Sequence, residues 1–294
     1  MVPFTIKQLR YFAALSRHLH FGRAAEECSI SQPALSVQVK ELEDLLGSPL
    51  VERGARRIYM TSLGEIFAAR SHDILLALDD LGNLAHSLDG GYAGRLRIGI
   101  IPTIAPYFLP SLFQRLSARF PTLEIHPREA VTQKLIEALQ EGRLDAAIVA
   151  LPVSEPALEE YALFSEAFFL VRPACDAGQP DPDIGMLRKM RLLLLEEGHC
   201  FRDQALSYCK MSSVQARDLI EGSSLSTLVQ MVGSGIGVTL IPEMAVRIET
   251  QSASVSVAQL PQPGASRTIG MVWRKTNPLA VQLAGIAKVV SRGH

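Results

Sequence analysis

The sequence lacks the long apolar runs and leader patterns that mark membrane and exported proteins. None of its apolar stretches approaches the roughly 20 residues that a bilayer-spanning helix needs. Residues 1–9 also lack the charged start and apolar segment that are typical of a secretory signal. We therefore expect a protein of the cytoplasm that has no membrane partner.

Cysteine is scarce, with four residues in a chain of 294 and no CxxC spacing. The four are Cys28, Cys175, Cys200 and Cys209. This usage excludes a disulfide scaffold and does not indicate a metal centre built from paired cysteines. In a cytoplasmic chain, two cysteines only nine positions apart raise the question of redox chemistry and not of structural cross-linking.

Net charge is nearly absent as well, at −1, so bulk electrostatics do not indicate a nucleic-acid partner. Residues 1–62 carry eight basic and six acidic residues, which is a weak positive excess. Apolar residues make up 48% and charged residues 20%, a globular composition in a chain long enough for two or three domains. Any case for DNA binding must therefore rest on pattern and placement.

The first 47 residues have the pattern of three helices. Thr5 is placed to cap the first, whose apolar residues recur every three positions: Ile6, Leu9, Phe12 and Leu15. A short helix over 22–28 and a turn over 29–31 follow. Ser31 then caps a helix that tolerates Pro33 in its first turn and ends at Gly47. Two helices joined by a three-residue turn predict a helix-turn-helix.

Residues 50–60 predict a two-stranded ribbon, a basic wing whose tip is formed by residues 54–57. Thr61 is placed to cap a long linker helix that runs to about residue 88 and ends in a glycine-rich hinge. Its apolar residues follow a heptad spacing, namely Phe67, Ile74, Leu81 and Leu88 with Leu78 and Ala85. This spacing predicts a dimer seam, and the alternative is one more core helix of a monomer.

From residue 94 onward, strands alternate with helices. Strands are expected at 96–101, 123–127, 145–150, 168–171, 191–195, 238–241 and 267–273, with helices over 107–119, 132–140, 202–210, 225–232 and 279–290. This order favours parallel sheets with helices on both faces. We predict three domains: a winged helix-turn-helix (1–62), a linker helix and hinge (63–93), and an α/β effector domain (94–294). The last has two Rossmann-like lobes arranged as in periplasmic binding proteins: lobe I at about 94–163 and 267–294, and lobe II at about 164–266.

The N-terminal residues resemble the DNA-binding signature of LysR-type transcriptional regulators. The matching segments are Ala24-Ala25, Ser31 to Ser36, Leu42-Glu43, Leu46-Gly47, Leu50, Arg53 and Thr61-x-x-Gly64. The remainder has the order and length of that family's effector domain. The resemblance implies a sequence-specific regulator of promoter DNA, a homodimer or a homotetramer of two dimers, and RNA polymerase as a partner.

A second, narrower resemblance is to the peroxide-sensing members of that family. It is carried by residues 198–205 with Cys209, and by segments at 101–107, 129–132 and 267–270. It implies that hydrogen peroxide oxidises Cys200 and that Cys209 resolves the product as a disulfide. It also implies a peroxide site formed by five residues: Thr103, Thr132, His199, Asp203 and Arg267.

The recognition helix offers side chains that can read DNA bases, and the wing offers cations for phosphates. The candidates on the helix are Ser31, Gln32, Pro33, Ser36 and Gln38. Those on the wing are Arg53, Arg56 and Arg57.

The spacing of the two cysteines carries a conformational consequence. A reactive cysteine must be a thiolate, which the start of a helix or a nearby cation favours. If the segment between Cys200 and Cys209 is helical, its nine residues separate the two by about 13 Å. A disulfide tolerates Cα separations of up to about 7 Å, so the bond requires the helix to unwind.

Other readings of the thiols stay open. Cys28 and Cys175 are expected to be inert, and Cys200 and Cys209 could also be two core thiols. A metal site of His199, Cys200 and Cys209 lacks a fourth ligand, and a cysteine hydrolase would not explain the DNA-binding domain. The main alternative is a LysR-type regulator of a small organic effector bound between the lobes. A thiol peroxidase is a further one. We expect no enzyme activity, no cofactor and no metal.

Overall fold

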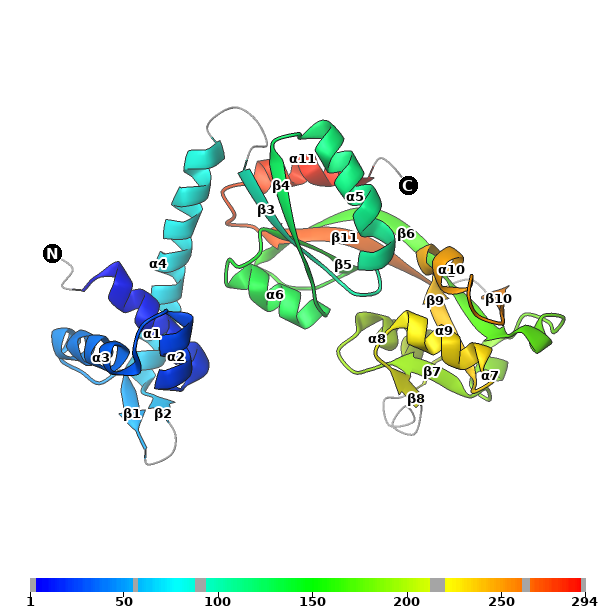
Figure 1. Cartoon of the computed structure of the whole chain (residues 1–294), viewed down its shortest axis with the longest axis horizontal. Helices are drawn as coiled ribbons and strands as arrows, with labels where there is room; N and C mark the ends of the chain where they lie inside the picture. The colour runs from blue at the N-terminus through cyan, green and yellow to red at the C-terminus, as the bar shows by residue number, and fades with distance from the viewer. Residues whose placement is uncertain (1–3, 55–57, 88–93, 212–219, 261–264, 292–294) are drawn as a thin grey trace. The chain divides into compact units, whose positions relative to one another are not determined.

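The computed structural model describes residues 4–54, 58–87, 94–211, 220–260 and 265–291, which fall into two units, Met1–Ala85 and His86–His294 (Figure 1). Within these described ranges, no helix is both long and apolar enough to cross a membrane. The domain boundaries drawn from the sequence stay predictions.

The first unit begins with three helices: α1 (Ile6–His18), α2 (Phe21–Glu27) and α3 (Gln32–Leu46). Thr5 and Gln8 form a reciprocal capping box at the start of α1, and Ser31 accepts a hydrogen bond from the amide of Ala34 at the start of α3. Gly47 ends α3 with φ +69°, a conformation that glycine adopts without strain. These caps and the turn between α2 and α3 are placed as the sequence predicts. The helices enclose a core of apolar side chains: Phe12, Leu15, Leu35, Val39 and Leu42.

The wing consists of the antiparallel strands β1 (Val51–Arg53) and β2 (Ile58–Met60). Glu43 of α3 accepts hydrogen bonds from the amides of Leu50 and Val51 at 2.7 and 3.1 Å. Thr61 Oγ1 donates to the carbonyl of Pro49 and accepts from the amide of Gly64. A Cβ at Gly64 would lie 2.0 Å from the carbonyl oxygen of Leu50. Only glycine therefore allows the next helix to lie this close to the wing.

That helix, α4 (Ser62–Ser87), has 26 residues. Phe67, assigned to the heptad by the sequence pattern, packs instead into the core of the first unit, edge-on to the rings of Phe4 and Phe12. Ile74 and Leu81 are exposed in the single chain. Leu88 and the side chain of Ala85 lie outside the described residues. The exposed apolar positions suit a surface that another chain would cover.

Lobe I contains the parallel strands β3 (Gly94–Ile100), β4 (Leu123–Glu129) and β5 (Ala146–Leu151) in the order β4-β3-β5. Helices α5 (Ala105–Arg119) and α11 (Ala280–Ser291) cover one face of this sheet, and α6 (Thr132–Gln140) lies on the other (Figure 1). The core of lobe I is formed by side chains from both layers, among them Ile98, Phe108, Leu135, Ile148 and Ile286.

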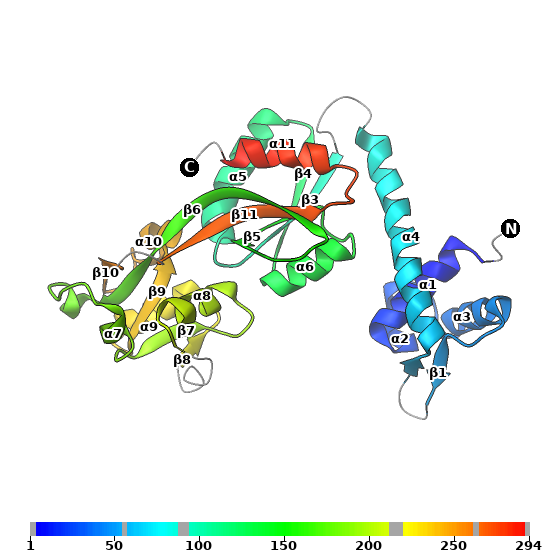
Figure 2. The ribbon, with the colours of Figure 1, turned by 180° about the vertical axis from the view of Figure 1, so that it is seen from behind.

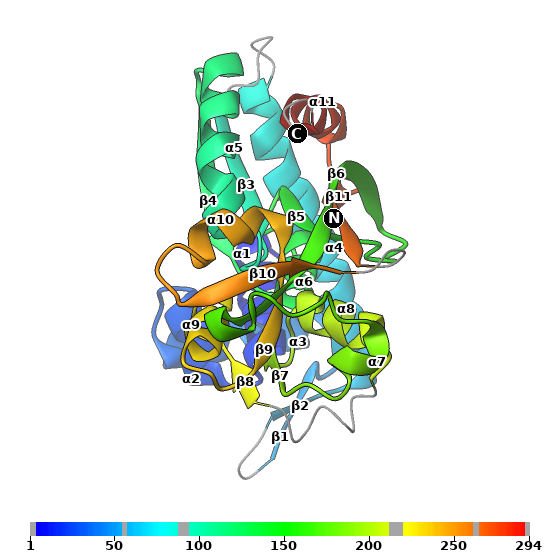
Figure 3. The same cartoon turned by 90° about the vertical axis from the view of Figure 1, so that its right-hand side faces the viewer.

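Lobe II has its own parallel strands, β7 (Leu192–Leu195), β8 (Ile220–Gly222) and β9 (Val238–Pro242), in the order β9-β7-β8. They lie between α8 (Cys200–Tyr208) and α9 (Leu225–Gly233) (Figure 3). The lobe is completed by η1 (Ala174–Asp176), α7 (Ile184–Leu187), α10 (Glu243–Glu249) and β10 (Val255–Gln259). The sequence pattern missed β8 and these four short elements.

Two long strands, β6 (Leu158–Pro173) and β11 (Ser266–Arg274), join the lobes (Figure 2). Each is antiparallel to its neighbours: β11 pairs with β5 and β6, and β6 continues into lobe II beside β9 and β10. The parallel arrangement expected from the sequence therefore holds within each lobe but not for the crossing strands. The sequence pattern also placed β6 only at 168–171, because its first half alternates between exposed and buried side chains and has no apolar run.

Candidate functional site

The recognition helix α3 presents its N-terminal turn to solvent. Ser31 is the N-cap, while Gln32 and Pro33 are exposed at the first two helical positions. Ser36 is half-buried, and Gln38 donates a hydrogen bond to Glu41 at 2.7 Å. Arg53 ends β1, but its side chain, together with Arg56 and Arg57, lies outside the described residues. The helix thus offers polar side chains and a capped N-terminus on one exposed surface.

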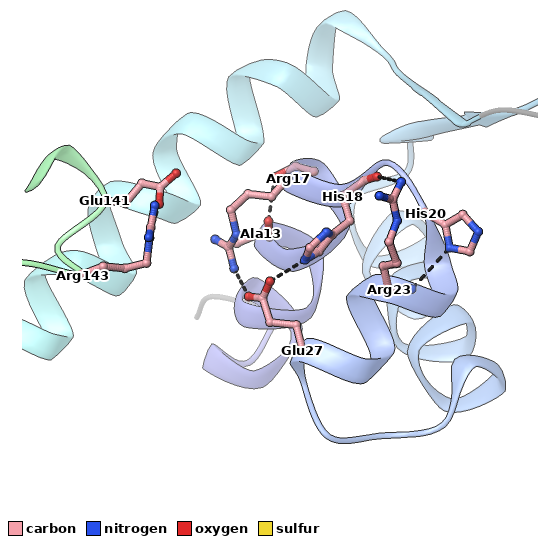
Figure 4. A network of polar contacts seen from close by, with 9 residues as sticks. Ala13, Arg17, His18, His20, Arg23, Glu27, Glu141 and Arg143 are labelled. Carbon is pink, nitrogen blue, oxygen red and sulfur yellow. Dashed lines mark hydrogen bonds and ion pairs between the residues drawn. The ribbon is translucent and has the colours of Figure 1, made fainter. Parts of the chain in front are cut away.

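A polar network ties α1 to α2 (Figure 4). Glu27 accepts hydrogen bonds from Arg17 and from His18, the latter at 2.6 Å. Burial raises the pKa of Glu27, but the hydrogen bonds from His18 and Arg17 outweigh it and leave that pKa below its ordinary value. His20 caps α2 by accepting from the amides of Gly22 and Arg23. Arg17 is therefore engaged within the unit, which lessens its availability for a phosphate.

In the second unit, a pocket of about 560 Å³ lies between α8 and the neighbouring parts of lobe I and β11. It brings together three of the five residues of the predicted peroxide site, Thr132, Asp203 and Arg267, with the predicted peroxidatic Cys200. The rest of its lining is Ile136, Ala150, Leu151, Pro152, Val153, Gln204, Ser266 and Thr268. The mixed polar and apolar wall, with a thiol in it, makes this pocket the candidate site.

Two polar atoms of this pocket stand out because they are buried and unpaired. Thr132 Oγ1, at the first position of α6, and Gln204 Oε1, on α8, have no hydrogen-bond partner among the described residues. A buried polar atom without a partner costs free energy, about 1–3 kcal/mol. Both residues line the same pocket, so its wall contains hydrogen-bonding groups that the described residues leave unused.

Arg267 is held in place by three elements. Its Nη1 donates to Thr103 Oγ1 at 2.9 Å, and its Nη2 donates to the Thr103 carbonyl at 3.1 Å. Its Nε donates to Glu166 Oε1 at 2.8 Å, and the guanidinium carbon lies 5.2 Å from the centre of the Phe201 ring. Thr103 thus does not line the pocket but supports the site indirectly, by accepting hydrogen bonds from Arg267.

Cys200 is the first residue of α8, and its half-buried side chain packs against the core of lobe I. His199 precedes it as the N-cap, makes no side-chain capping hydrogen bond and is not among the pocket-lining residues. Burial lowers the pKa of His199, while the charges of Glu196 and Glu129 act in the opposite direction. His199 is therefore mainly neutral at pH 7.

Cys209 lies at the other end of the same helix and is fully buried in the core of lobe II. Burial raises the pKa of its thiol to about 11. All four cysteines are free thiols. Because α8 is helical from Cys200 to Tyr208, the two cysteines are separated by about 13 Å. As they stand, the thiols cannot form a disulfide.

Sequence reasoning missed two residues of this site. Gln204 lies in the segment that carries the resemblance, one position after Asp203, yet nothing in the sequence shows that its side chain faces the pocket. Glu166 is an acidic residue just before an apolar run. Its charge next to a predicted strand is the only feature of the sequence that could have indicated a role. Its partner Arg267 is 101 positions away.

Residues 6–65 match the family described as "Bacterial regulatory helix-turn-helix protein, lysR family", and residues 89–288 match "LysR substrate binding domain". Among curated relatives, a "Probable hydrogen peroxide-inducible genes activator" of Streptomyces viridosporus is 40% identical, over 92% of this chain and 88% of its own length. The "DNA-binding transcriptional dual regulator OxyR" of Escherichia coli K12 is 36% identical, over 97% of this chain and 94% of its own.

Solved structures agree with the curated relatives. A full-length cysteine-to-aspartate variant of Pseudomonas aeruginosa OxyR is 35% identical with a TM-score of 0.74, covering 98% of this chain and 94% of that one. A cysteine-to-serine variant of Corynebacterium glutamicum OxyR, described as bound to hydrogen peroxide, is 34% identical with a TM-score of 0.67, covering 98% and 92%. Both domains match LysR family models, and the relatives align over almost the whole chain. This chain therefore belongs to the LysR family of bacterial helix-turn-helix transcription regulators, with OxyR proteins among its relatives.

Proposed function

We propose that this protein is a peroxide-responsive transcription regulator of the OxyR type, in which Cys200 is the peroxidatic and Cys209 the resolving cysteine. The observation that carries the proposal is the placement of one thiol at a helix start in a pocket with unpaired polar atoms. The second thiol is buried at the far end of the same helix. Thr103, Thr132, Asp203 and Arg267 are the proposed peroxide-site residues, with His199 beside them.

The proposed chemistry has two steps. The Cys200 thiolate attacks one peroxide oxygen, the O–O bond breaks, and the departing hydroxide takes a proton and leaves as water, which makes Cys200 a sulfenic acid. The Cys209 thiol then attacks that sulfur, a second water leaves, and the disulfide forms. The raised pKa of Cys209 keeps this thiol protonated in the folded helix, so the second step follows unwinding of α8.

The direct test uses the reduced full-length chain with stoichiometric hydrogen peroxide. Peptide mass spectrometry without reductant is expected to find a Cys200–Cys209 bond, and footprints on genomic fragments are expected to change with it. Failure to find that bond, or footprints that stay the same after it forms, would contradict the proposal.

Thr132→Val tests the pocket itself. Because Thr132 Oγ1 has no partner among the described residues, its removal is expected to leave folding stability unchanged or slightly raised. If the hydroxyl binds peroxide, oxidation of Cys200 is expected to slow by about 10-fold, which corresponds to one hydrogen bond. Stopped-flow oxidation measures the rate. Thr250→Val, at the C-cap of α10, is the control, since its hydroxyl already donates to the carbonyl of Val246. Equal rates in both variants would argue against a ligand at Thr132.

For DNA, we propose that α3 enters the major groove of promoter DNA and that the wing arginines hold phosphates. The exposed apolar positions of α4 support a homodimer, and family membership supports a homotetramer, contact with RNA polymerase and a cytoplasmic location. We further propose that the regulator acts by binding and is not an enzyme. The three predicted domains, 1–62, 63–93 and 94–294, are the framework for these roles.

Gln32→Ala is expected to weaken specific DNA binding by about 10- to 100-fold, since a bidentate base contact discriminates by about 1–3 kcal/mol. The exposed position of Gln32 predicts unchanged stability. Titration of a footprinted fragment against a scrambled one measures the change, with Gln133→Ala, exposed in the second unit, as the matched control. A similar loss on both fragments would point to phosphate contacts and not to base reading.

A second candidate function is control by a small organic effector, and the size of the pocket favours it. At about 560 Å³, the pocket falls within the range of about 300–1,000 Å³ that is usual for small-molecule sites. Thermal-shift screening of the Cys200→Ser protein against metabolites would separate the two. An organic ligand that stabilises this variant and changes its footprint would establish the alternative.

A further inference from the structure

Glu166 and Arg267 form a buried ion pair next to the pocket. They are directly opposite each other in the antiparallel pair of β6 and β11, and their side chains are 5% and 0% exposed. One carboxylate oxygen of Glu166 accepts from Arg267, and the other accepts from the amide of Met244 at 3.1 Å. The carboxylate is therefore fixed on both sides, by β11 and by the first turn of α10.

This carboxylate decides how the guanidinium of Arg267 lies. Nε donates to Glu166, Nη2 lies 2.8 Å from the same carboxylate oxygen, and both terminal nitrogens donate to Thr103, so the group cannot rotate without breaking hydrogen bonds on two sides. The ring of Phe201, the residue after Cys200, lies near the same guanidinium. The orientation of Arg267 in the pocket wall is thus set from outside the pocket.

The carboxylate also offsets a charge. A buried guanidinium without a counterion would favour the anionic form of any thiol near it, and a thiolate reacts with electrophiles of many kinds. With Glu166 in place, the positive charge of Arg267 is compensated, and the arginine serves as an oriented hydrogen-bond donor. Peroxide gains from oriented donors when its O–O bond breaks, whereas an alkylating agent needs only the thiolate.

We propose that Glu166 is a positioning residue that makes Cys200 selective for peroxide, by orienting Arg267 and by offsetting its charge. This inference rests on the proposed function, in which the Cys200 sulfur takes one peroxide oxygen and the other leaves as water. Glu166 itself touches neither the thiol nor the ligand and acts only through Arg267.

The test compares two reagents on the reduced full-length chain. Second-order rate constants for hydrogen peroxide and for iodoacetamide are followed at the Cys200 peptide by mass spectrometry. In Glu166→Gln, the ratio of the peroxide to the iodoacetamide rate constant is expected to fall by at least about 10-fold, because small misplacements of a reacting geometry are costly. Peroxide should react more slowly, and alkylation should become faster.

Two further variants keep the result decisive. Glu159→Gln removes an exposed carboxylate from the same strand and is expected to change neither rate. Glu166→Asp keeps the charge, but its side chain is too short to hold both Arg267 and Met244. The reaction with peroxide should therefore slow, while the alkylation rate stays the same. If Glu166→Gln does not fold, the test rests on Glu166→Asp. If Cys200 of the wild-type chain does not react with peroxide, the proposed function itself is overturned. A reactive wild type with an unchanged ratio in the Glu166 variants would overturn only the role of Glu166.

Discussion

Cys200→Ser is expected to abolish the reaction with peroxide, whereas Cys209→Ser should stop the reaction after its first step, the oxidation of Cys200. A serine hydroxyl stays protonated at neutral pH and cannot replace the thiolate, so oxidation at position 200 should fall to background. In Cys209→Ser, the first step needs only the pocket, so peroxide should be consumed at the wild-type rate. The product should remain a sulfenic acid, detectable with a sulfenic-acid trap and mass spectrometry.

The DNA readout separates the two steps. Neither variant should change its footprint with peroxide, because only the disulfide requires α8 to unwind. Cys175→Ser is the matched control, since Cys175 is an exposed thiol of lobe II outside the pocket, and it should behave as wild type. A changed footprint in oxidised Cys209→Ser would mean that the sulfenic acid alone switches the protein.

Glu221→Gln is expected to make the disulfide form more favourable. Arg202, in the first turn of α8, is almost fully buried and donates to Glu221 Oε1 at 2.6 Å and to the carbonyl of Leu195 at 2.8 Å. Unwinding of α8 must withdraw this arginine, so the pair stabilises the reduced form. Removing one partner of a buried pair costs about 3–5 kcal/mol, but Glu221 is 34% exposed, and screening by solvent reduces the cost to about 2 kcal/mol.

That energy corresponds to a midpoint potential about 40 mV more negative in Glu221→Gln, measured against glutathione buffers. Glu141→Gln is a matched control, because Glu141 is 33% exposed and also pairs with an arginine, Arg143, but that arginine is 47% exposed (Figure 4). Its loss should leave the potential unchanged. If both variants leave the potential at the wild-type value, the Arg202 pair survives oxidation and α8 does not unwind at its start.

The DNA-binding unit could be predicted almost residue by residue because its signals are local. Thr5, Ser31, Gly47 and Thr61 each mark a helix end within a few positions of the residues that they cap. The close approach of α4 to the wing, which requires Gly64, was carried by the family signature, and its physical cause appears only in the structure.

The effector domain could be predicted only in part. Helices with apolar faces and short buried strands were found, but the long strand β6 was not, since half of it alternates in burial and lies at the junction of two sheets. The pairing of Glu166 with Arg267 depends on the register of strands that are far apart in sequence. The separation of Cys200 from Cys209, by contrast, follows from helix geometry and needed no tertiary information.

The two crossing strands have a further consequence for how a signal leaves the pocket. β6 and β11 are paired from Leu158–Arg274 to Ala167–Ser266, with one shift of register between Ile269 and Gly270, so a single two-stranded ribbon runs through both lobes. A clamshell closure like that of a binding protein with flexible connections would have to bend or break this ribbon. A change confined to a single helix costs this molecule less free energy. It leaves the ribbon intact as a fixed frame against which the rearranged segment moves.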